Sequence, residues 1–165
     1  MEADEMTDEN RKKLSLIVFS GDLDKLFAAF TIATGAAASD MDVVMFFTFW
    51  GLRALKKKRG TGRSLFGRLL GRMYGGDIER ATPSRLSFGG VGRWMFKKMM
   101  KAKRVPSLTE LRQTAIDLGV KFYGCQTSMS VMEIPKEALI DEVNACVGIA
   151  YFLEQAQQSD ISLFV

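Results

Sequence analysis

The chain has 165 residues and contains no histidine. Neither a Ser-His-Asp triad nor a Cys-His pair can form among these residues, so a general base would be a carboxylate, a lysine, a tyrosine or a thiolate. There are only two cysteines, Cys125 and Cys146, and they lack the CxxC spacing of a zinc site. We therefore expect no metal site, and we expect an enzyme of this composition to use its thiol directly or to borrow a cofactor.

Long hydrophobic runs are also missing. The longest apolar stretches, such as residues 42–52, are too short to cross a bilayer as a helix. The first thirteen residues are polar and charged, without the apolar segment of a signal peptide. Two cysteines in such a chain are expected to be reduced. The sequence thus predicts a cytoplasmic protein, whose residues 1–12 form a disordered acidic N-terminus.

What the chain does contain is an alternation of strand and helix patterns. Leu14–Phe19 and Val43–Phe49 are short apolar, β-branched runs, as expected for strands buried on both faces. Between them apolar residues recur from Leu23 to Ala33 at helical spacing, after a break at Ser20-Gly21-Asp22. This pattern is typical of a β-α-β unit.

The same alternation returns near the C-terminus. Ser107 and Glu110 have the spacing of a capping box and predict a helix that ends at Gly119. The predicted elements that follow are a strand at 120–123, helices at 126–132 and 136–141, a strand at 145–147, a helix at 148–157 and a strand at 162–165. Residues 13–165 are therefore expected to form a single-domain, doubly wound α/β fold with a mainly parallel sheet of about five strands.

Residues 53–104 differ from the rest of the chain in charge. They carry sixteen basic residues and two acidic ones, a balance of 16 − 2 = +14, so the remainder carries −10 to reach the total of +4. We interpret the segment as a basic amphipathic insertion, with two short helices around a flexible centre at residues 74–76. One helix has its apolar face at Leu65–Met73, and the other at Met95, Met99 and Ala102.

Three strand ends define the predicted ligand site. In parallel sheets ligands bind beyond the carboxyl ends of the strands, and neighbouring strands bring their ends to one rim. The rim would hold a thiol, Cys125, and small or aromatic residues from three loops. The predicted pocket or anion-binding residues are Gly21, Asp22, Phe49, Trp50, Gly51, Gly124, Gln126 and Thr127.

Cys125 lies where a strand pattern ends and a helix pattern begins. A helix amino-terminus lowers the pKa of a thiol and favours the nucleophilic thiolate. Such a thiol could attack a sulfane sulfur and hold it as a persulfide, which requires little beyond access and a low pKa. With no histidine available, the helix dipole and a lysine or arginine would have to activate it. The alternative is a buried, inert cysteine.

Cys146 has a different setting. It lies in the apolar run NACVGIA, which favours a structural role. The alternative is that Cys146 resolves a persulfide or disulfide on Cys125, which requires the two sulfur atoms to approach each other.

The basic insertion has several interpretations. It leaves the second strand at the carboxyl edge of the sheet, so we expect residues 53–104 to cover or flank the rim that bears Cys125. Basic amphipathic helices also lie on anionic membranes or dock an acidic partner or a sister subunit. A fourth interpretation is a solvated cap whose apolar face covers its own domain. Nucleic acid is not expected, because aromatic residues are not interleaved as a stacking platform.

Three stretches of the chain resemble the DsrE/DsrF-like sulfur-carrier family. They are FSGDLDKLFAAFTIATGAA, VVMFFTFWGL and GVKFYGCQTSMSVM, and the similarity extends over nearly the whole chain after Lys12. The insertion after the second strand resembles the larger branch of this family. The resemblance implies an α/β sheet of about five parallel strands, homo-oligomers, and sulfur relay through a persulfide on the cysteine that Cys125 matches.

The resemblance also implies partners, namely small sulfur carriers of the TusA type and rhodaneses. The predicted function is thus a sulfur carrier or sulfurtransferase that needs no cofactor. The alternative is a non-catalytic regulatory or peripheral-membrane module on the same fold, with residues 53–104 as its working surface.

Overall fold

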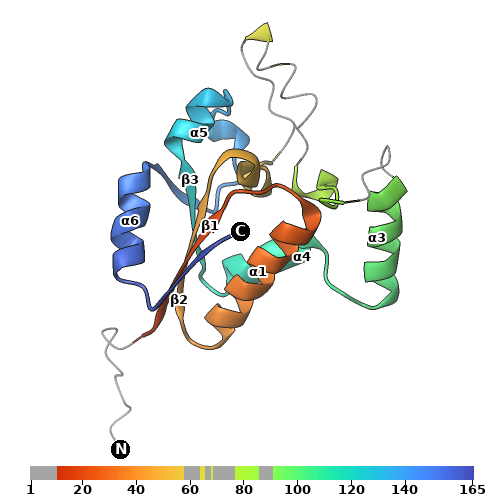
Figure 1. Ribbon diagram of the computed structural model, residues 1–165, viewed down its shortest axis with the longest axis horizontal. Coiled ribbons are helices and arrows are strands. Elements are labelled where there is room, and N and C mark those ends of the chain that lie inside the picture. The colour runs from red at the N-terminus through yellow and green to blue at the C-terminus, as the bar shows by residue number, and fades with distance from the viewer. Residues whose placement is uncertain (1–10, 58–63, 66–67, 69–76, 86–90) are drawn as a thin grey trace, which may run out of the picture.

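The computed structural model describes residues 11–57, 64, 65, 68, 77–85 and 91–165 (Figure 1). Strands and helices alternate along the chain as the periodicity predicts. The strands are β1 (Lys13–Val18), β2 (Asp42–Phe47), β3 (Lys121–Cys125), β4 (Val143–Val147) and β5 (Ile161–Phe164). The α-helices are α1 (Leu23–Ala38), α3 (Val91–Ala102), α4 (Leu108–Asp117), α5 (Gln126–Val131) and α6 (Ile149–Gln157), and the 3-10 helices are η2 (Phe49–Leu55), η3 (Ile78–Arg80) and η5 (Lys136–Ala138).

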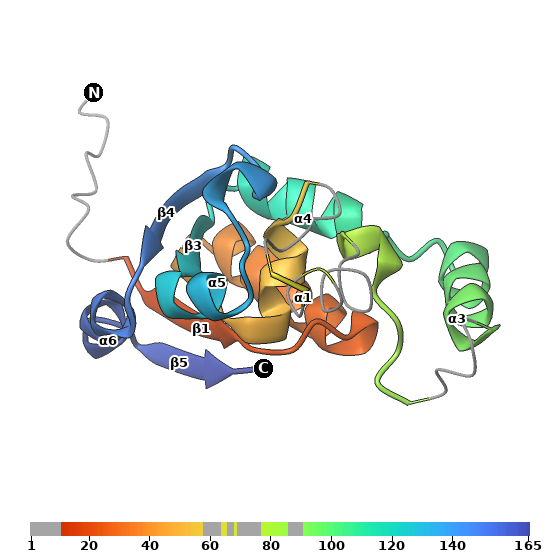
Figure 2. The same ribbon diagram turned by 90° about the horizontal axis from the view of Figure 1, so that it is seen from above.

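Among the described residues, the five strands form one all-parallel sheet in the order β4-β3-β2-β1-β5. Helix α6 lies on one face of the sheet, and α1 and α4 lie on the other (Figures 1 and 2). This three-layer arrangement confirms the predicted doubly wound α/β class. Short helix α5 lies at the carboxyl ends of the strands, beside β3.

The two faces of the sheet bury cores of different size. The larger core, under α1 and α4, includes Leu16, Phe30, Phe47 and Phe122, all fully buried. The smaller core lies under α6 and contains Phe46, Phe152 and Cys125. Because side chains alternate along a strand, neighbouring residues such as Phe46 and Phe47 belong to different cores. The same alternation decides the face to which each cysteine belongs.

Two predicted elements differ from the structure. The second strand ends at Phe47 instead of Phe49, because the chain turns into η2 and Phe49 takes a left-handed φ of 43°. The helix predicted over 136–141 is only the 3-10 turn η5 (Lys136–Ala138), since Ile140 leaves it to donate its N–H to the Leu55 carbonyl. A contact between segments distant in sequence thus overrides a local helix signal.

Parts of the insertion and of the N-terminus lie outside the described residues. This applies to the predicted disorder of residues 1–10, to most of the helix over 65–73 and to the centre at 74–76. The second predicted helix is present as α3, but it lies beyond α1 and α4 and away from α5 in both views (Figures 1 and 2). Helix α3 therefore does not cover Cys125, whereas η2, which contains the first residues of the insertion, flanks β3.

Candidate functional site

The carboxyl ends of β1, β2 and β3 meet at one rim, as the sequence predicted, because these strands are neighbours. Glycines allow the first two loops to pack closely. A Cβ atom on Gly51 would lie 2.1 Å from the Val18 carbonyl oxygen, and one on Gly21 would lie 2.5 Å from that of Trp50. Both distances are far shorter than side-chain atoms tolerate. Both positions therefore require glycine for the backbone segments of the rim to approach this closely.

Cys125 ends β3 and is the N-cap residue of α5. Its side chain is 7% exposed and packs against the small core under α6, with Phe46 and Phe152. The next two residues, Gln126 and Thr127, are exposed. The sulfur atom therefore lies just beneath the surface, with apolar side chains below it and the polar first turn of α5 above it.

Hydrogen-bond donors converge on this sulfur from two elements. Burial by itself raises the pKa of the Cys125 thiol. The hydroxyl and backbone N–H of Ser128, the hydroxyl of Thr48 and the backbone N–H of Thr127 favour the thiolate, and together they bring the pKa below its ordinary value. The thiol of Cys125 is thus more acidic than an exposed cysteine although it is buried.

The two hydroxyl donors are also bonded to each other. Thr48 Oγ1 and Ser128 Oγ are 2.7 Å apart, and Ser128 is 1% exposed. Each hydroxyl has a single proton, so one proton must serve this contact and only the other can point at the thiolate. The arrangement is a chain in which one hydroxyl donates to the second and the second donates to sulfur. Such chains polarise their members and strengthen the terminal bond.

Sequence reasoning missed Thr48 as a donor to the thiol. It assigned activation to the helix dipole and a lysine or arginine, whereas the described residues that lower the pKa of Cys125 do so through hydrogen bonds and none of them is a cation. Helix α5 has only six residues, so local hydroxyl and backbone donors carry the effect. One signal for Thr48 was available, because this residue directly follows β2.

Cys146 lies on the opposite face of the sheet from Cys125. It pairs with Gly124, one residue before Cys125, and packs against the large core. A β-bulge produces this parity: Asn144 is skipped in the pairing of β4 with β3, and its side-chain oxygen accepts the Phe122 N–H at 2.7 Å. Burial raises the pKa of Cys146, with Lys136 opposing the shift. The geometry therefore disfavours a disulfide between the two cysteines.

Asp22, Phe49 and Gly124 were also predicted to lie at the rim. Asp22 caps α1, but the first amide of that helix, on Leu23, already donates to the Thr82 carbonyl at 2.9 Å. The chain itself thus takes up one of the amides at this predicted anion-binding position. Phe49 is 41% exposed and packs on Phe19, with ring centroids 5.6 Å apart. Gly124 lies beside Cys125 with space for no large side chain, since a Cβ atom there would meet Met129 at 3.3 Å.

The small core that contains Cys125 also holds a pair of hydrogen-bonded tyrosine hydroxyls, which was not predicted from the sequence. Tyr123, two residues earlier on the same face of β3, lies 2.9 Å from the hydroxyl of Tyr151 on α6. Burial raises the pKa of Tyr123 to about 12, and Tyr151 adds to the shift through its hydrogen bond and charge. Tyr123 therefore remains neutral at physiological pH and serves as a polar wall of the small core.

The residues at this rim define a class of protein: an α/β domain that presents one activated thiol at the carboxyl edge of a parallel sheet. Within the described residues no cluster of acidic or cysteine side chains could hold a metal ion. In that same part of the chain, none of the helices combines the length and the apolar character needed to span a membrane.

Comparison with known proteins identifies the family. Residues 10–164 match the DsrE/DsrF/DrsH-like family, and the chain belongs to it. It is 36% identical to the uncharacterized protein YrkE of Bacillus subtilis over 163 residues, which cover 95% of this chain and 99% of that protein. It is 35% identical to the sulfur carrier protein DsrE2 of Allochromatium vinosum over 158 residues, covering 94% and 99%.

A solved structure also shares the fold. The crystal structure of the ychN protein from E. coli superposes with a TM-score of 0.59 and covers 93% of this chain and 99% of its own. The two sequences are 12% identical, so this likeness concerns the fold alone.

Proposed function

We propose that the protein is a sulfur carrier that holds sulfane sulfur as a persulfide on Cys125. The observation that carries the proposal is the set of donors from Thr48, Thr127 and Ser128, which lowers the pKa of a buried thiol at the sheet edge. Membership of the DsrE/DsrF/DrsH-like family and similarity to a named sulfur carrier support it.

The loading step needs no external oxidant or reductant. The Cys125 thiolate attacks the outer sulfur of a donor persulfide, RS–SH, and forms a new S–S bond. The old S–S bond breaks, and the donor leaves as RS⁻ with the bonding electron pair. Transfer to an acceptor thiolate reverses these roles. The donors that stabilise the thiolate of Cys125 also make it a good leaving group in that second step.

The expected partners are proteins that carry or generate sulfane sulfur, namely a TusA-type carrier and a rhodanese. A cytoplasmic location and a homo-oligomeric assembly fit this role. The burial of Cys125 suits a carrier, because a shielded persulfide is less exposed to adventitious thiols. Gln126 and Thr127 are exposed and directly follow Cys125, so a partner can touch them close to the sulfur.

Mass spectrometry tests this proposal. We expect the intact protein to gain the mass of one sulfur atom after incubation with polysulfide or a loaded carrier, and Cys125→Ser not to gain it. The matched control is Cys146→Ala, which keeps Cys125 and should load like the wild type. Equal loading of wild type and Cys125→Ser would exclude a sulfur carrier that works through Cys125.

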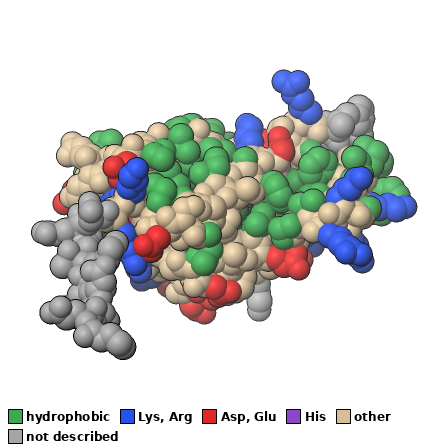
Figure 3. All heavy atoms as spheres, turned by 90° about the horizontal axis from the view of Figure 1, so that it is seen from below, with side chains coloured by type: hydrophobic (Ala, Val, Ile, Leu, Met, Phe, Trp, Pro, Cys, Tyr) green, Lys and Arg blue, Asp and Glu red, His purple; other side chains and the backbone are tan. Residues whose placement is uncertain are grey.

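One observation favours a second candidate, a peripheral contact with an anionic membrane. Val91, Met95 and Met99, four residues apart, form an apolar stripe on α3 and are 64%, 44% and 59% exposed. Gly92 is the buried residue of this helix, so the stripe does not cover its own domain. At the end of the molecule where α3 lies, basic side chains stand next to hydrophobic ones (Figure 3). Apolar stripes flanked by cations are typical of interfacial helices.

Sedimentation with lipid vesicles tests the second candidate. We expect binding to vesicles containing phosphatidylglycerol and little binding to neutral phosphatidylcholine. The double substitution Met95→Glu and Met99→Glu should reduce binding at least about tenfold, by removing apolar contact and adding repulsion. Leu118→Glu, at an exposed apolar position after α4, is the control. An equal loss of vesicle binding in the double variant and in Leu118→Glu would argue against a contact through α3.

A further inference from the structure

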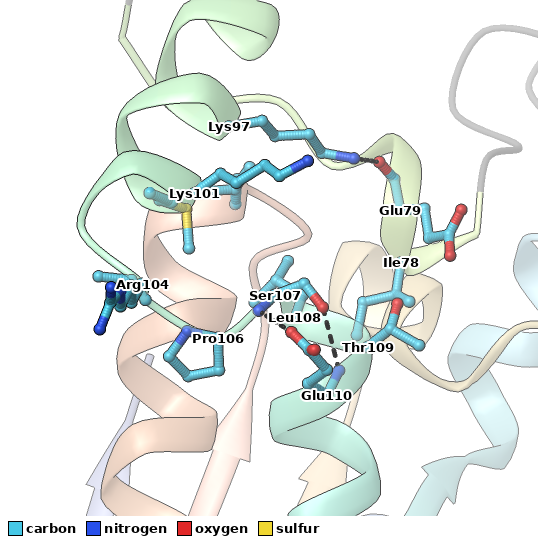
Figure 4. A pocket seen from close by; sticks show the side chains of 13 residues that line it. Ile78, Glu79, Lys97, Lys101, Arg104, Pro106, Ser107, Leu108, Thr109 and Glu110 are labelled. Atoms are coloured by element: carbon cyan, nitrogen blue, oxygen red, sulfur yellow. Dashed lines mark hydrogen bonds between the residues drawn. The ribbon is translucent and has the colours of Figure 1, made fainter.

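A cavity of about 710 Å³ lies on the other side of α3, where this helix faces the body of the protein (Figure 4). Its walls come from α3, the link between α3 and α4, the first turn of α4, the start of α1 and η3. This volume is within the range of small-molecule sites. The site is separate from Cys125, since α3 and α5 lie apart in Figures 1 and 2.

The lining is apolar at its base. Leu23, Ile78 and Leu108 are 2%, 2% and 6% exposed and belong to the large core. Met100, Val105 and Pro106 add further apolar surface from α3 and the link that follows it. A ligand in this cavity would therefore exchange water for hydrocarbon on most of one side.

Cations stand above this apolar base. Lys97, Lys101 and Arg104 follow the spacing i, i+4 and i+7, so they share one side of the helix and its end. In Figure 4 the side chains of Lys97 and Lys101 extend in the same direction, toward η3. The Lys97 ammonium donates to the backbone carbonyl of Glu79 at 2.6 Å, a neutral acceptor that leaves its charge uncompensated.

The two acidic residues at the cavity do not neutralise these cations. The Glu110 carboxylate turns back to accept the N–H of Ser107 at 2.7 Å, in the capping box of α4. The Glu79 carboxylate points away from Lys101 in Figure 4. Among the described residues, none forms an ion pair with Lys101 or Arg104. The cavity thus combines a hydrocarbon base with an uncompensated positive rim.

We propose that this cavity binds an amphiphilic anion, with an alkyl chain on the apolar base and an acidic head group at Lys97 and Lys101. Free fatty carboxylates and anionic membrane lipids share this chemistry. The position of the cavity favours a free ligand, since it lies on the opposite side of α3 from the exposed stripe of Val91, Met95 and Met99.

Calorimetric titration of the full chain with decanoate, below its micelle concentration, tests the proposal. From hexanoate to decanoate we expect affinity to rise by up to about fourfold for each added methylene, the value of burying one CH₂ group. Decyltrimethylammonium, with an alkyl chain of the same length and the opposite charge, should bind at least about tenfold more weakly.

Two charge reversals on the same helix localise the site. Lys101→Glu should weaken decanoate binding about tenfold or more, because it replaces attraction by repulsion near the head group. Lys98→Glu changes the net charge equally, but Lys98 lies over Trp94 and does not line the cavity. It should bind decanoate like the wild type. Both residues are exposed, so circular dichroism should show the same fold for both variants.

Several outcomes would overturn the proposal. They are the absence of decanoate binding, an affinity that does not depend on chain length, and equal weakening by Lys98→Glu and Lys101→Glu. Binding to phosphatidylglycerol vesicles without binding to decanoate would assign the anion preference to the exposed stripe of α3 and would reject the cavity. None of these measurements depends on Cys125, so they remain informative if the sulfur-carrier proposal fails.

Discussion

At the scale of single residues, the hydroxyls of Thr48 and Ser128 are among the donors that lower the pKa of Cys125. Thr48→Val removes one hydroxyl while keeping the shape of the side chain, and Thr48→Ser keeps the hydroxyl. We expect Thr48→Val to slow alkylation of Cys125 by iodoacetamide about three- to tenfold at neutral pH. A lost charge-assisted bond lowers the thiolate fraction, and the greater nucleophilicity of a more basic thiolate offsets part of the loss.

Stopped-flow or quenched alkylation followed by peptide mapping measures this effect. Thr48→Ser should react at nearly the wild-type rate, which separates loss of the hydroxyl from a disturbance of the loop. Ser130→Ala, at an exposed serine of α5, is a second control. A Thr48→Val protein as reactive as Thr48→Ser would show that the hydroxyl chain does not activate the thiol.

The pH dependence of stability gives an independent measure of the same residue. The pKa of Cys125 is lower in the folded than in the unfolded protein, so the thiolate adds stability above the unfolded pKa of about 8.5. That stability is lost as the pH falls through the folded pKa. The protein that keeps Cys125 should therefore gain stability over its Cys125→Ser variant as the pH rises from the folded to the unfolded pKa of the thiol. The difference in their free energies of unfolding should grow by at most about 1.4 kcal/mol per pH unit.

Urea unfolding at several pH values tests this sign. The comparison is best made in a Cys146→Ala background, because the raised pKa of Cys146 gives the opposite dependence. A difference between the two proteins that falls with rising pH would mean that burial outweighs the hydrogen bonds at Cys125.

At the scale of secondary-structure elements, the bulge in β4 sets the face on which Cys146 lies. The Asn144 side chain accepts the buried Phe122 N–H at 2.7 Å, in place of a strand carbonyl. We expect Asn144→Ala to lower the free energy of unfolding by about 1–3 kcal/mol, the cost of leaving a buried donor without a partner. Asn144→Asp keeps an acceptor oxygen and should be less destabilising in urea unfolding.

The same bulge predicts the redox behaviour of the two cysteines. Because their side chains lie on opposite faces of the sheet, we expect oxidation of the folded protein to give no Cys125–Cys146 disulfide. Non-reducing peptide mapping before and after unfolding checks this. A disulfide that forms rapidly in the folded state would mean that β4 changes its register.

At the scale of the whole molecule, edge strand β5 presents an apolar surface. Ile161, Leu163 and Phe164 are 44%, 37% and 67% exposed, and Phe164 stacks on Phe19 with ring centroids 5.9 Å apart. Within the described residues β5 pairs with β1 on one side only. An open strand edge is a template for pairing with another chain, and an exposed apolar patch marks an interaction site.

We therefore predict that the expected homo-oligomer uses the β5 edge. Phe164→Asp should shift the protein toward the monomer in sedimentation-velocity or light-scattering measurements. Val131→Asp, at an exposed apolar residue of α5, should leave the assembly unchanged and serves as the control. An assembly insensitive to Phe164→Asp would place the subunit contact elsewhere.

The sequence by itself determined the order of strands and helices and the position of the thiol. Local periodicity shows which residues share a face of one element, and the capping box of Ser107 and Glu110 marks the start of α4 directly. It also places Cys125 between a strand and a helix. These features depend on residues close together along the chain, so pattern alone reveals them.

Only the tertiary structure decided what surrounds that thiol. Thr48 and Ser128 are 80 residues apart and meet because β2 and β3 pair side by side. Periodicity also showed that Met95 and Met99 share a side of α3, but not that this side faces outward, because the orientation of a helix depends on which surface it packs against. The activated thiol and the exposed stripe of α3 are both products of contacts between segments distant in sequence.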